Sequence, residues 1–267
     1  MVIETWPALG AGILLALAAL ARSLAMAGRH GPWGLIAATA RGAAGVALVA
    51  ALILAAWVQG RWSPYDMRQV ALGLALATVG LHLAMTRQPP IGDAGPLADL
   101  VALALTAVGL ALRPGGPALT LAQRTALFYA RWVLFLLGAG AVTVAGSAGL
   151  TLALSVGMTR HNPAVRQPPR VGLYSLLTAA TSLALVMLGG GLVVSSWQAW
   201  RTVGLLSSGD PRDGWMAITW LVAANSLLAW RLERRPGRWA AALAVLAAMA
   251  ALFGLFLVVE VRRLLGL

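Results

Sequence analysis

Eight long hydrophobic stretches run along the chain, separated by short connections that are rich in glycine, proline and arginine. A helix of about 20 apolar residues is long enough to cross the hydrocarbon core of a bilayer. The connections are too short to fold by themselves. The pattern therefore predicts an all-α, polytopic integral membrane helix bundle of about eight transmembrane helices, with residues 1–267 as a single membrane domain. The expected spans lie near 7–26, 35–58, 69–86, 97–112, 125–157, 171–196, 215–230 and 240–260.

The composition agrees with this pattern and excludes several other classes of protein. Hydrophobic residues make up 60% of the chain and charged residues 10%, whereas about a quarter of the residues in an ordinary soluble domain are charged. The 20 basic residues are all arginines, scattered singly between apolar stretches, which argues against a nucleic-acid partner. The absence of cysteine excludes disulfides and thiolate metal sites. The expected surroundings of the chain are therefore the lipid bilayer.

Two connections, 159–170 and 231–238, carry seven of the arginines and fall on the same side of an eight-helix bundle. The positive-inside rule makes that side cytoplasmic. Both termini and the connection 197–214 are then external, and we expect the protein in the plasma membrane of a prokaryote. The first stretch has no basic segment before it, so we expect it to remain as a helix rather than to be removed as a secretory signal.

Charged and glycine positions inside the stretches also need a physical explanation. The fifth stretch is longer than a bilayer is thick. Either its N-terminal end, with Arg124 and Arg131, stands out of the membrane, or the helix tilts and Arg131 reaches the headgroups. Arg41 and Asp99 each need a partner or an interfacial position, and reaching towards the membrane surface is the simpler expectation. Glycines within 138–149 and 189–191 predict close packing between helices.

Residues 210–221 read DPRDGWMAITWL and carry the most specific pattern in the chain. This segment resembles the D-P-K-E-x-W-x-x-I-T-W-L segment of the cytochrome c assembly family, specifically the CcsA-type (ResC-type) heme-handling membrane protein. The resemblance implies eight helices, heme as the cofactor, and a function in handling or supporting delivery of heme at the outer membrane face. It also implies other membrane subunits as partners, with apocytochrome c or a second cytochrome c assembly protein among the candidates.

The candidate heme-contacting residues lie around this segment, with one exception. Aromatic rings stack on a porphyrin and imidazole ligates iron, and the family uses both. We expect Asp210 to cap the helix that follows, with Pro211 in its first turn, so that the external loop folds back onto the bundle. His82, within the third stretch, is a further candidate heme contact, and an interhelical hydrogen bond is the alternative. The candidates are Trp197, Trp200, Asp210, Pro211, Asp213, Trp215, Trp220 and His82.

The sequence departs from the family where the heme chemistry is expected. Family tryptophans of the loop fall at Gly209, Ser207 and Val203, and family histidines fall near Arg131 or Trp132, near Leu228, and near Arg262 or Arg263. This departure supports an alternative function: a heme-free relative that serves as a structural or assembly subunit of a larger electron-transport complex. No arrangement of a nucleophile with a base predicts an independent catalytic activity, and no catalytic or metal-ligating residues are assigned.

Overall fold

The structure of the protein is a computed structural model, and it describes residues 5–26, 32–60, 62–87, 96–113, 115, 125–161, 170–206, 209–232 and 238–257. All regular structure in these residues is helical, which confirms the predicted helix bundle. In a bilayer this is the expected outcome, because a helix satisfies its own backbone hydrogen bonds. The helices are α1 (Thr5–Met26), α2 (Trp33–Val58), α3 (Met67–Thr86), α4 (Pro96–Ala111), α5 (Ala126–His161), α6 (Arg170–Val203), α7 (Pro211–Leu232), α8 (Arg238–Leu252) and the short π-helix η2 (Phe253–Leu257).

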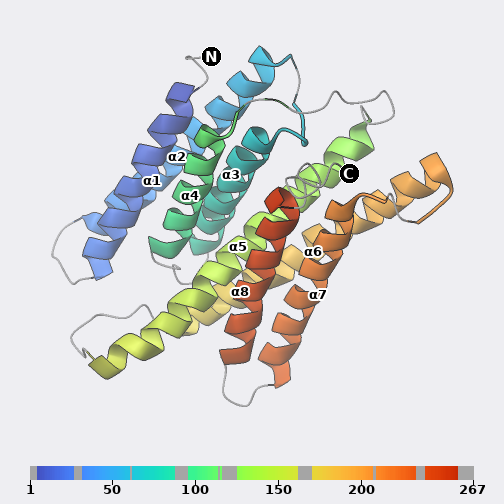
Figure 1. Ribbon diagram of the computed structural model, residues 1–267. Coiled ribbons are helices and arrows are strands. Elements are labelled where there is room, and N and C mark those ends of the chain that lie inside the picture. The colour runs from blue at the N-terminus through green and yellow to red at the C-terminus, as the bar shows by residue number, and fades with distance from the viewer. Residues whose placement is uncertain are drawn as a thin grey trace.

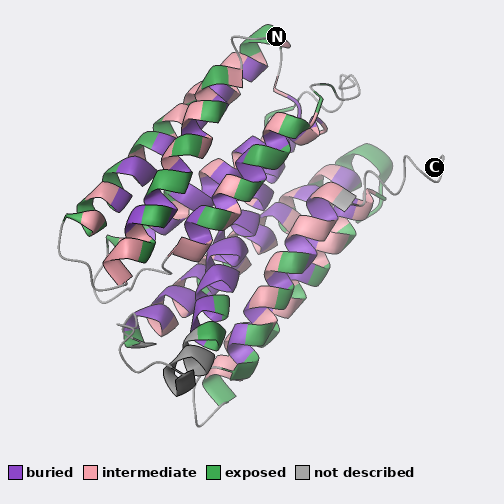
Figure 2. Cartoon of the chain, turned by 60° about the vertical axis from the view of Figure 1, so that its left-hand side comes forward, coloured by how far each residue is buried: buried purple, intermediate pink, exposed green. Residues whose placement is uncertain are grey.

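The helices form two four-helix bundles that lie side by side (Figure 1). In the first bundle α1 and α3 each pack against α2 and α4, and in the second α5 and α7 each pack against α6 and α8. Contacts of α5 with α3 and α4 join the two bundles. The apolar span of α5 is 78% buried, whereas those of α1 and α2 are each 28% buried. α5 is therefore the central helix, and α1 and α2 present most of their surface to the outside, as Figure 2 shows.

Glycines let the central helix approach its neighbours closely, as the sequence predicted. A Cβ atom at Gly140 on α5 would lie 2.8 Å from the Cβ of Ala77 on α3. A Cβ atom at Gly191 on α6 would lie 2.5 Å from the ring of Phe135 on α5. Both distances are shorter than carbon–carbon contact allows, so a larger residue at either position would push two helices apart. Small residues at such contacts are typical of helix packing in membranes.

Among the described residues, six helices are long and apolar enough to cross a membrane: α1, α2, α3, α5, α6, and α8 together with η2, which form one span over Arg238–Phe256. α4 is apolar but has 16 residues. α7 has 22 residues and carries Arg212, Asp213, Asn225 and Arg231, which lower its mean hydropathy. The number and order of the helices agree with the sequence prediction.

The main difference from the prediction is the end of α6. The helix continues to Val203 instead of ending near residue 196, so Trp197 and Trp200 lie on α6 and not in a loop. It ends where Gly204 takes a φ of 72° and its N–H donates to the carbonyl oxygen of Trp200. A glycine in the left-handed region commonly follows the last turn of a helix. The connection between α6 and α7 is therefore 204–210, shorter than the expected 197–214.

Candidate functional site

The start of α7 is built around Asp210. Its Oδ1 accepts a hydrogen bond from the backbone N–H of Arg212 at 3.0 Å, and its carbonyl oxygen accepts one from the N–H of Asp213 at 3.0 Å. A carboxylate at a helix N-terminus satisfies an otherwise unpaired N–H and interacts favourably with the helix dipole. Pro211 occupies the first helical position, where no donor is needed. The predicted cap is confirmed.

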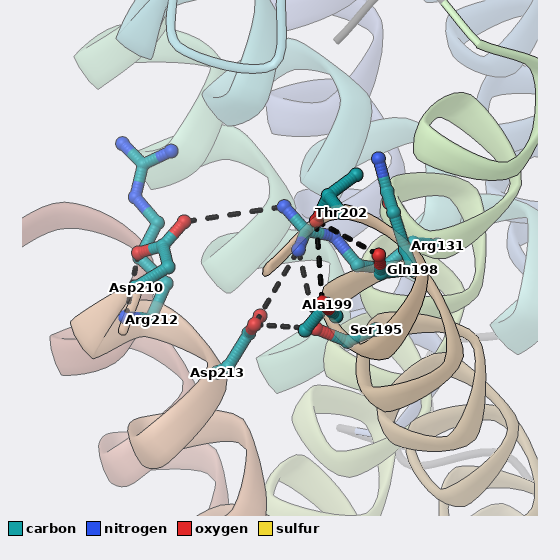
Figure 3. Close-up of polar contacts among 8 residues, drawn as sticks. All are labelled: Arg131, Ser195, Gln198, Ala199, Thr202, Asp210, Arg212 and Asp213. Carbon is teal, nitrogen blue, oxygen red and sulfur yellow. Dashed lines mark hydrogen bonds and ion pairs between the residues drawn. The ribbon is translucent and has the colours of Figure 1, made fainter. Parts of the chain in front are cut away.

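A buried arginine from α5 holds this start of α7 against the bundle. Nη1 of Arg131 donates to Ser195 Oγ on α6 at 3.2 Å and to Asp213 Oδ2 at 3.4 Å. Nη2 of Arg131 lies 3.9 Å from Asp210 Oδ2, and Ser195 Oγ donates to Asp213 Oδ2. Figure 3 shows the guanidinium of Arg131 pointing towards both carboxylates. We call Arg131, Ser195, Asp210, Arg212 and Asp213 the Arg131 cluster.

Arg212 extends the Arg131 cluster to the first four-helix bundle. Its Nη1 donates to the carbonyl oxygen of Pro64, in the connection between α2 and α3, at 3.2 Å. Its Cζ lies 5.2 Å from the ring centre of Tyr65 and 5.1 Å from that of Trp132, which are cation–π distances. Arg212 is 2% exposed and Trp132 is 1% exposed. The start of α7 is thus attached to all three of α5, α6 and the α2–α3 connection.

Charges within the cluster balance, which makes their burial tolerable. Two guanidinium groups face two carboxylates, and buried charges persist in proteins when they are paired and hydrogen-bonded. Burial raises the pKa of Tyr65 above its ordinary value of 10.0, and the negative charge of Asp210 raises it further. Tyr65 therefore remains a neutral phenol at physiological pH, and its ring is available to the guanidinium of Arg212.

Two of the four candidate tryptophans are packed into the second bundle. Nε1 of Trp220 donates to the carbonyl oxygen of Leu185 on α6 at 3.0 Å, and the indole lies over Gly189. The ring of Trp215 is 4.5 Å from that of Phe253 in η2. Both side chains are partly buried. These contacts tie α7 to α6 and to the end of α8, so neither ring is free to form an open aromatic surface.

The other two tryptophans form an open apolar recess near the C-terminal end of α6. Trp197 is 49% exposed and Trp200 is 54% exposed, and their ring centres are 5.7 Å apart. The recess has a volume of about 540 Å³. We call it the α6 recess, and its lining residues are Leu192, Val193, Ser196, Trp197, Trp200 and Leu206. Its size is within the range of protein sites for small apolar ligands and cofactors.

His82 is not part of this region. It is 1% exposed on α3, with Nδ1 3.9 Å from Asp99 Oδ1 on α4. Arg41 on α2 makes a bidentate pair with Asp99, with Nε to Oδ1 and Nη2 to Oδ2 both at 2.7 Å. We call Arg41, His82 and Asp99 the Arg41 cluster. The structure therefore brings His82 to a buried ion pair and agrees with the alternative of a polar contact between helices.

The structure bears on two sequence expectations about charged residues. Arg131 is 4% exposed and paired with Asp213, which argues against the alternative in which its side chain extends to the headgroups. Arg41 and Asp99 pair with each other inside the first bundle, so each has the partner that the sequence allowed in place of the simpler expectation of a position at the membrane surface. The sequence held a signal for both pairs: each arginine lies inside an apolar stretch, where an unpaired charge is costly, and acidic residues are few. Which acid each arginine would find depends on tertiary contacts, since the pairs are far apart in the chain.

The comparisons with known proteins bear on the fold. No protein-family model matches the chain, and no curated protein is similar to it in sequence. A solved structure described as "Cytochrome c Heme Lyase CcmF" is similar, with a TM-score of 0.70 and 17% sequence identity. The similarity covers 95% of this chain and 46% of that chain, so this chain spans about half the length of the heme lyase. Over nearly its whole length the chain thus has the fold of part of this solved structure.

Proposed function

We propose that this chain is a membrane protein of the cytochrome c assembly type that supports delivery of heme at the outer membrane face, with the iron ligands supplied by a partner. The observation that carries the proposal is the α6 recess. It presents two exposed indole rings next to the connection that leads into the Asp210–Pro211 segment, on a bundle with the fold of a heme lyase. Aromatic rings and aliphatic side chains are the groups that favour a flat apolar macrocycle.

The residues present fit the ring of heme better than its iron. The α6 recess is lined by aliphatic residues, two tryptophans and Ser196, none of which is an established axial ligand of heme iron. Near Arg131, where the family resemblance implies a histidine, a guanidinium pairs with two carboxylates. Arginine stays protonated and has no lone pair to offer a metal. In this proposal apocytochrome c or a second cytochrome c assembly protein therefore provides the iron ligand.

The Arg131 cluster has a supporting role in this proposal. Capping by Asp210 and pairing of Asp213 with Arg131 hold the start of α7 in place. Leu206, which lines the α6 recess, lies a few residues before this fixed start in the sequence. The cluster thus serves to position the surface around the α6 recess. We propose that the protein acts in the plasma membrane of a prokaryote, with the α6–α7 connection on the external side.

A second candidate function is favoured by the same arginine. Arg131 and Trp132 are both buried and fill the space where the family resemblance implies a heme ligand, which suits a heme-free relative that serves as a structural subunit of an electron-transport complex. The two candidate functions can be distinguished by purifying the protein with its partners from native membranes and measuring heme by pyridine hemochrome analysis. Heme that co-purifies with the complex supports heme delivery. A complex of fixed stoichiometry that contains no heme supports the structural subunit.

A further inference from the structure

One face of α7 carries a regular stripe of exposed residues. Successive members are separated alternately by three and four positions, and the apolar members are between 43% and 72% exposed. We call it the α7 stripe, and its members are Ile218, Leu221, Asn225, Leu228 and Leu232. Spacing of this kind places all five side chains on one line along a helix, as in two helices that cross at about +20°. Most helix pairs in membranes use this geometry.

The α7 stripe points away from the other helices that the structure describes. The buried side of α7, with Met216, Thr219, Ala223 and Ser226, faces α6 and α8. Ser226 confirms the direction, because its Oγ donates to the carbonyl oxygen of Ala240 on α8 at 2.8 Å. Figure 1 shows α7 at the edge of the second bundle, on the side opposite to α1. The stripe is therefore open to the lipid or to another protein.

Asn225, at the centre of the stripe, is an unusual residue for a face exposed to lipid. Among the helical residues that the structure describes, it is the only exposed carboxamide. At 1.5 Å per residue it lies about 15 Å along the helix from Trp215 and about 7 Å from Trp230, which places it between the two expected interfaces. Its Nδ2 donates to the carbonyl oxygen of Leu221 in its own helix. The second N–H and the carbonyl oxygen of the side chain are left to an outside partner.

We propose that the α7 stripe is a dimer interface and that its occupant is the α7 stripe of a second copy of this chain. Two copies inserted in the same orientation are related by a two-fold axis along the membrane normal, which brings residues of equal depth together. Asn225 then faces Asn225 of the second copy. A carboxamide has both a donor and an acceptor, so two of them form reciprocal hydrogen bonds with complementary partial charges. The flanking leucines are equally self-complementary.

The polar residue also gives the interface its register. An asparagine within an apolar seam fixes the alignment of two helices, because any shifted pairing leaves its polar atoms against hydrocarbon. Hydrogen bonds between membrane helices contribute about 0.6 to 2 kcal/mol, which corresponds to a change of roughly three- to thirty-fold in an association constant. The interface rests on the stripe alone and does not depend on heme.

Single cysteines test the interface directly, because the native chain contains none. We expect Leu221→Cys and Leu228→Cys to form disulfide dimers in native membranes when copper phenanthroline and oxygen take two electrons and two protons from each thiol pair. Val186→Cys on α6 and Leu246→Cys on α8 are the matched controls, because Val186 and Leu246 are 67% and 50% exposed on other faces. Equal cross-linking at the control and stripe positions would overturn the proposal, as would no dimer at either stripe position.

The contribution of Asn225 is tested separately. In a dilution series in lipid bilayers, with dimers counted by single-molecule photobleaching, we expect Asn225→Val to weaken dimerisation by roughly three- to thirty-fold. Asn225→Gln keeps the carboxamide and should retain most of the affinity. An unchanged affinity of Asn225→Val contradicts the role of the carboxamide. Cross-linking of Leu221→Cys to a different membrane protein, with no homodimer, shows that the occupant is another subunit and overturns the proposal.

Discussion

The buried pair of Arg41 and Asp99 allows a quantitative test of the packing of the first bundle. Each charged side chain is replaced by an apolar one of similar size, in the single variants Arg41→Met and Asp99→Leu and then in the double variant. Both charged side chains are almost fully buried, at 3% and 1% exposure, and both hydrogen bonds are 2.7 Å long. Each single substitution therefore leaves a charge inside the bundle without its main partner.

The magnitude follows from two independent estimates. Breaking a buried ion pair by removing one partner typically costs about 3 to 5 kcal/mol. A charge at the centre of a membrane helix costs about 2.5 to 3.5 kcal/mol on insertion scales. These ranges overlap near 3 kcal/mol, which is the loss of unfolding free energy that we expect for either single variant. The double variant leaves no unpaired charge, and replacing a whole buried pair with apolar groups is often close to neutral.

The assay is a double-mutant cycle on the purified protein. Unfolding by sodium dodecyl sulfate in mixed micelles, followed by tryptophan fluorescence, gives the unfolding free energy of the four proteins. The expected coupling energy between the two positions is about 6 kcal/mol, because the two single variants together should lose about that much and the double variant close to none. If the two losses add within about 0.5 kcal/mol, the pair is not coupled and the reasoning is refuted.

Three further predictions concern the loop end of the molecule and the central helix. Arg131→Met removes the cation that binds Asp213 and Ser195, so we expect a loss of about 2 to 4 kcal/mol in unfolding free energy and faster hydrogen exchange at the start of α7. Unchanged hydrogen exchange there would contradict the attachment of α7 by Arg131. Tyr65 has a pKa above 10.0 in the folded protein. Its contribution to stability is therefore complete at pH values below the pKa of Tyr65 in the unfolded chain, and it is lost as the pH rises through the pKa of Tyr65 in the folded protein. An absorbance titration of the wild type minus Tyr65→Phe should show one phenol that ionises above pH 10.0, and ionisation at or below that value would argue against its burial. Gly149→Val should destabilise the protein by about 2 to 4 kcal/mol, because a Cβ there would lie 2.8 Å from the backbone oxygen of Ala241, whereas Gly80→Val, which meets no atom within 4 Å, should have little effect.

Much of the fold could be predicted from the sequence because the bilayer imposes a simple rule on it. A helix that crosses the hydrocarbon core needs about 20 apolar residues, so the presence and order of the eight helices follow from the hydrophobic pattern. The end of α6 was missed because a helix continues until a residue stops it, whether or not the hydrophobic pattern continues with it. Gly204 is that residue, and its effect depends on a positive φ that hydrophobicity does not record.

The candidate site was harder to predict because its important contacts join distant parts of the chain. The cap at Asp210 was predictable, since it depends on neighbours in the sequence. The attachment of Asp213 to Arg131 was not, because it requires the start of α7 to lie beside the start of α5. The tryptophans show the same limit: Trp197 and Trp220 look alike as sequence positions, yet one is exposed and the other lies against Gly189.

The most direct test of the proposed function is binding of hemin to the α6 recess. We expect hemin added to the protein in lipid nanodiscs to bind beyond the level of empty nanodiscs, with a spectrum that lacks histidine ligation. Binding should fall at least ten-fold in Trp197→Ala/Trp200→Ala. It should persist in Trp57→Ala, because Trp57 is 80% exposed on α2 and outside the recess. Equal binding by all three proteins, or none by the wild type, would contradict the account.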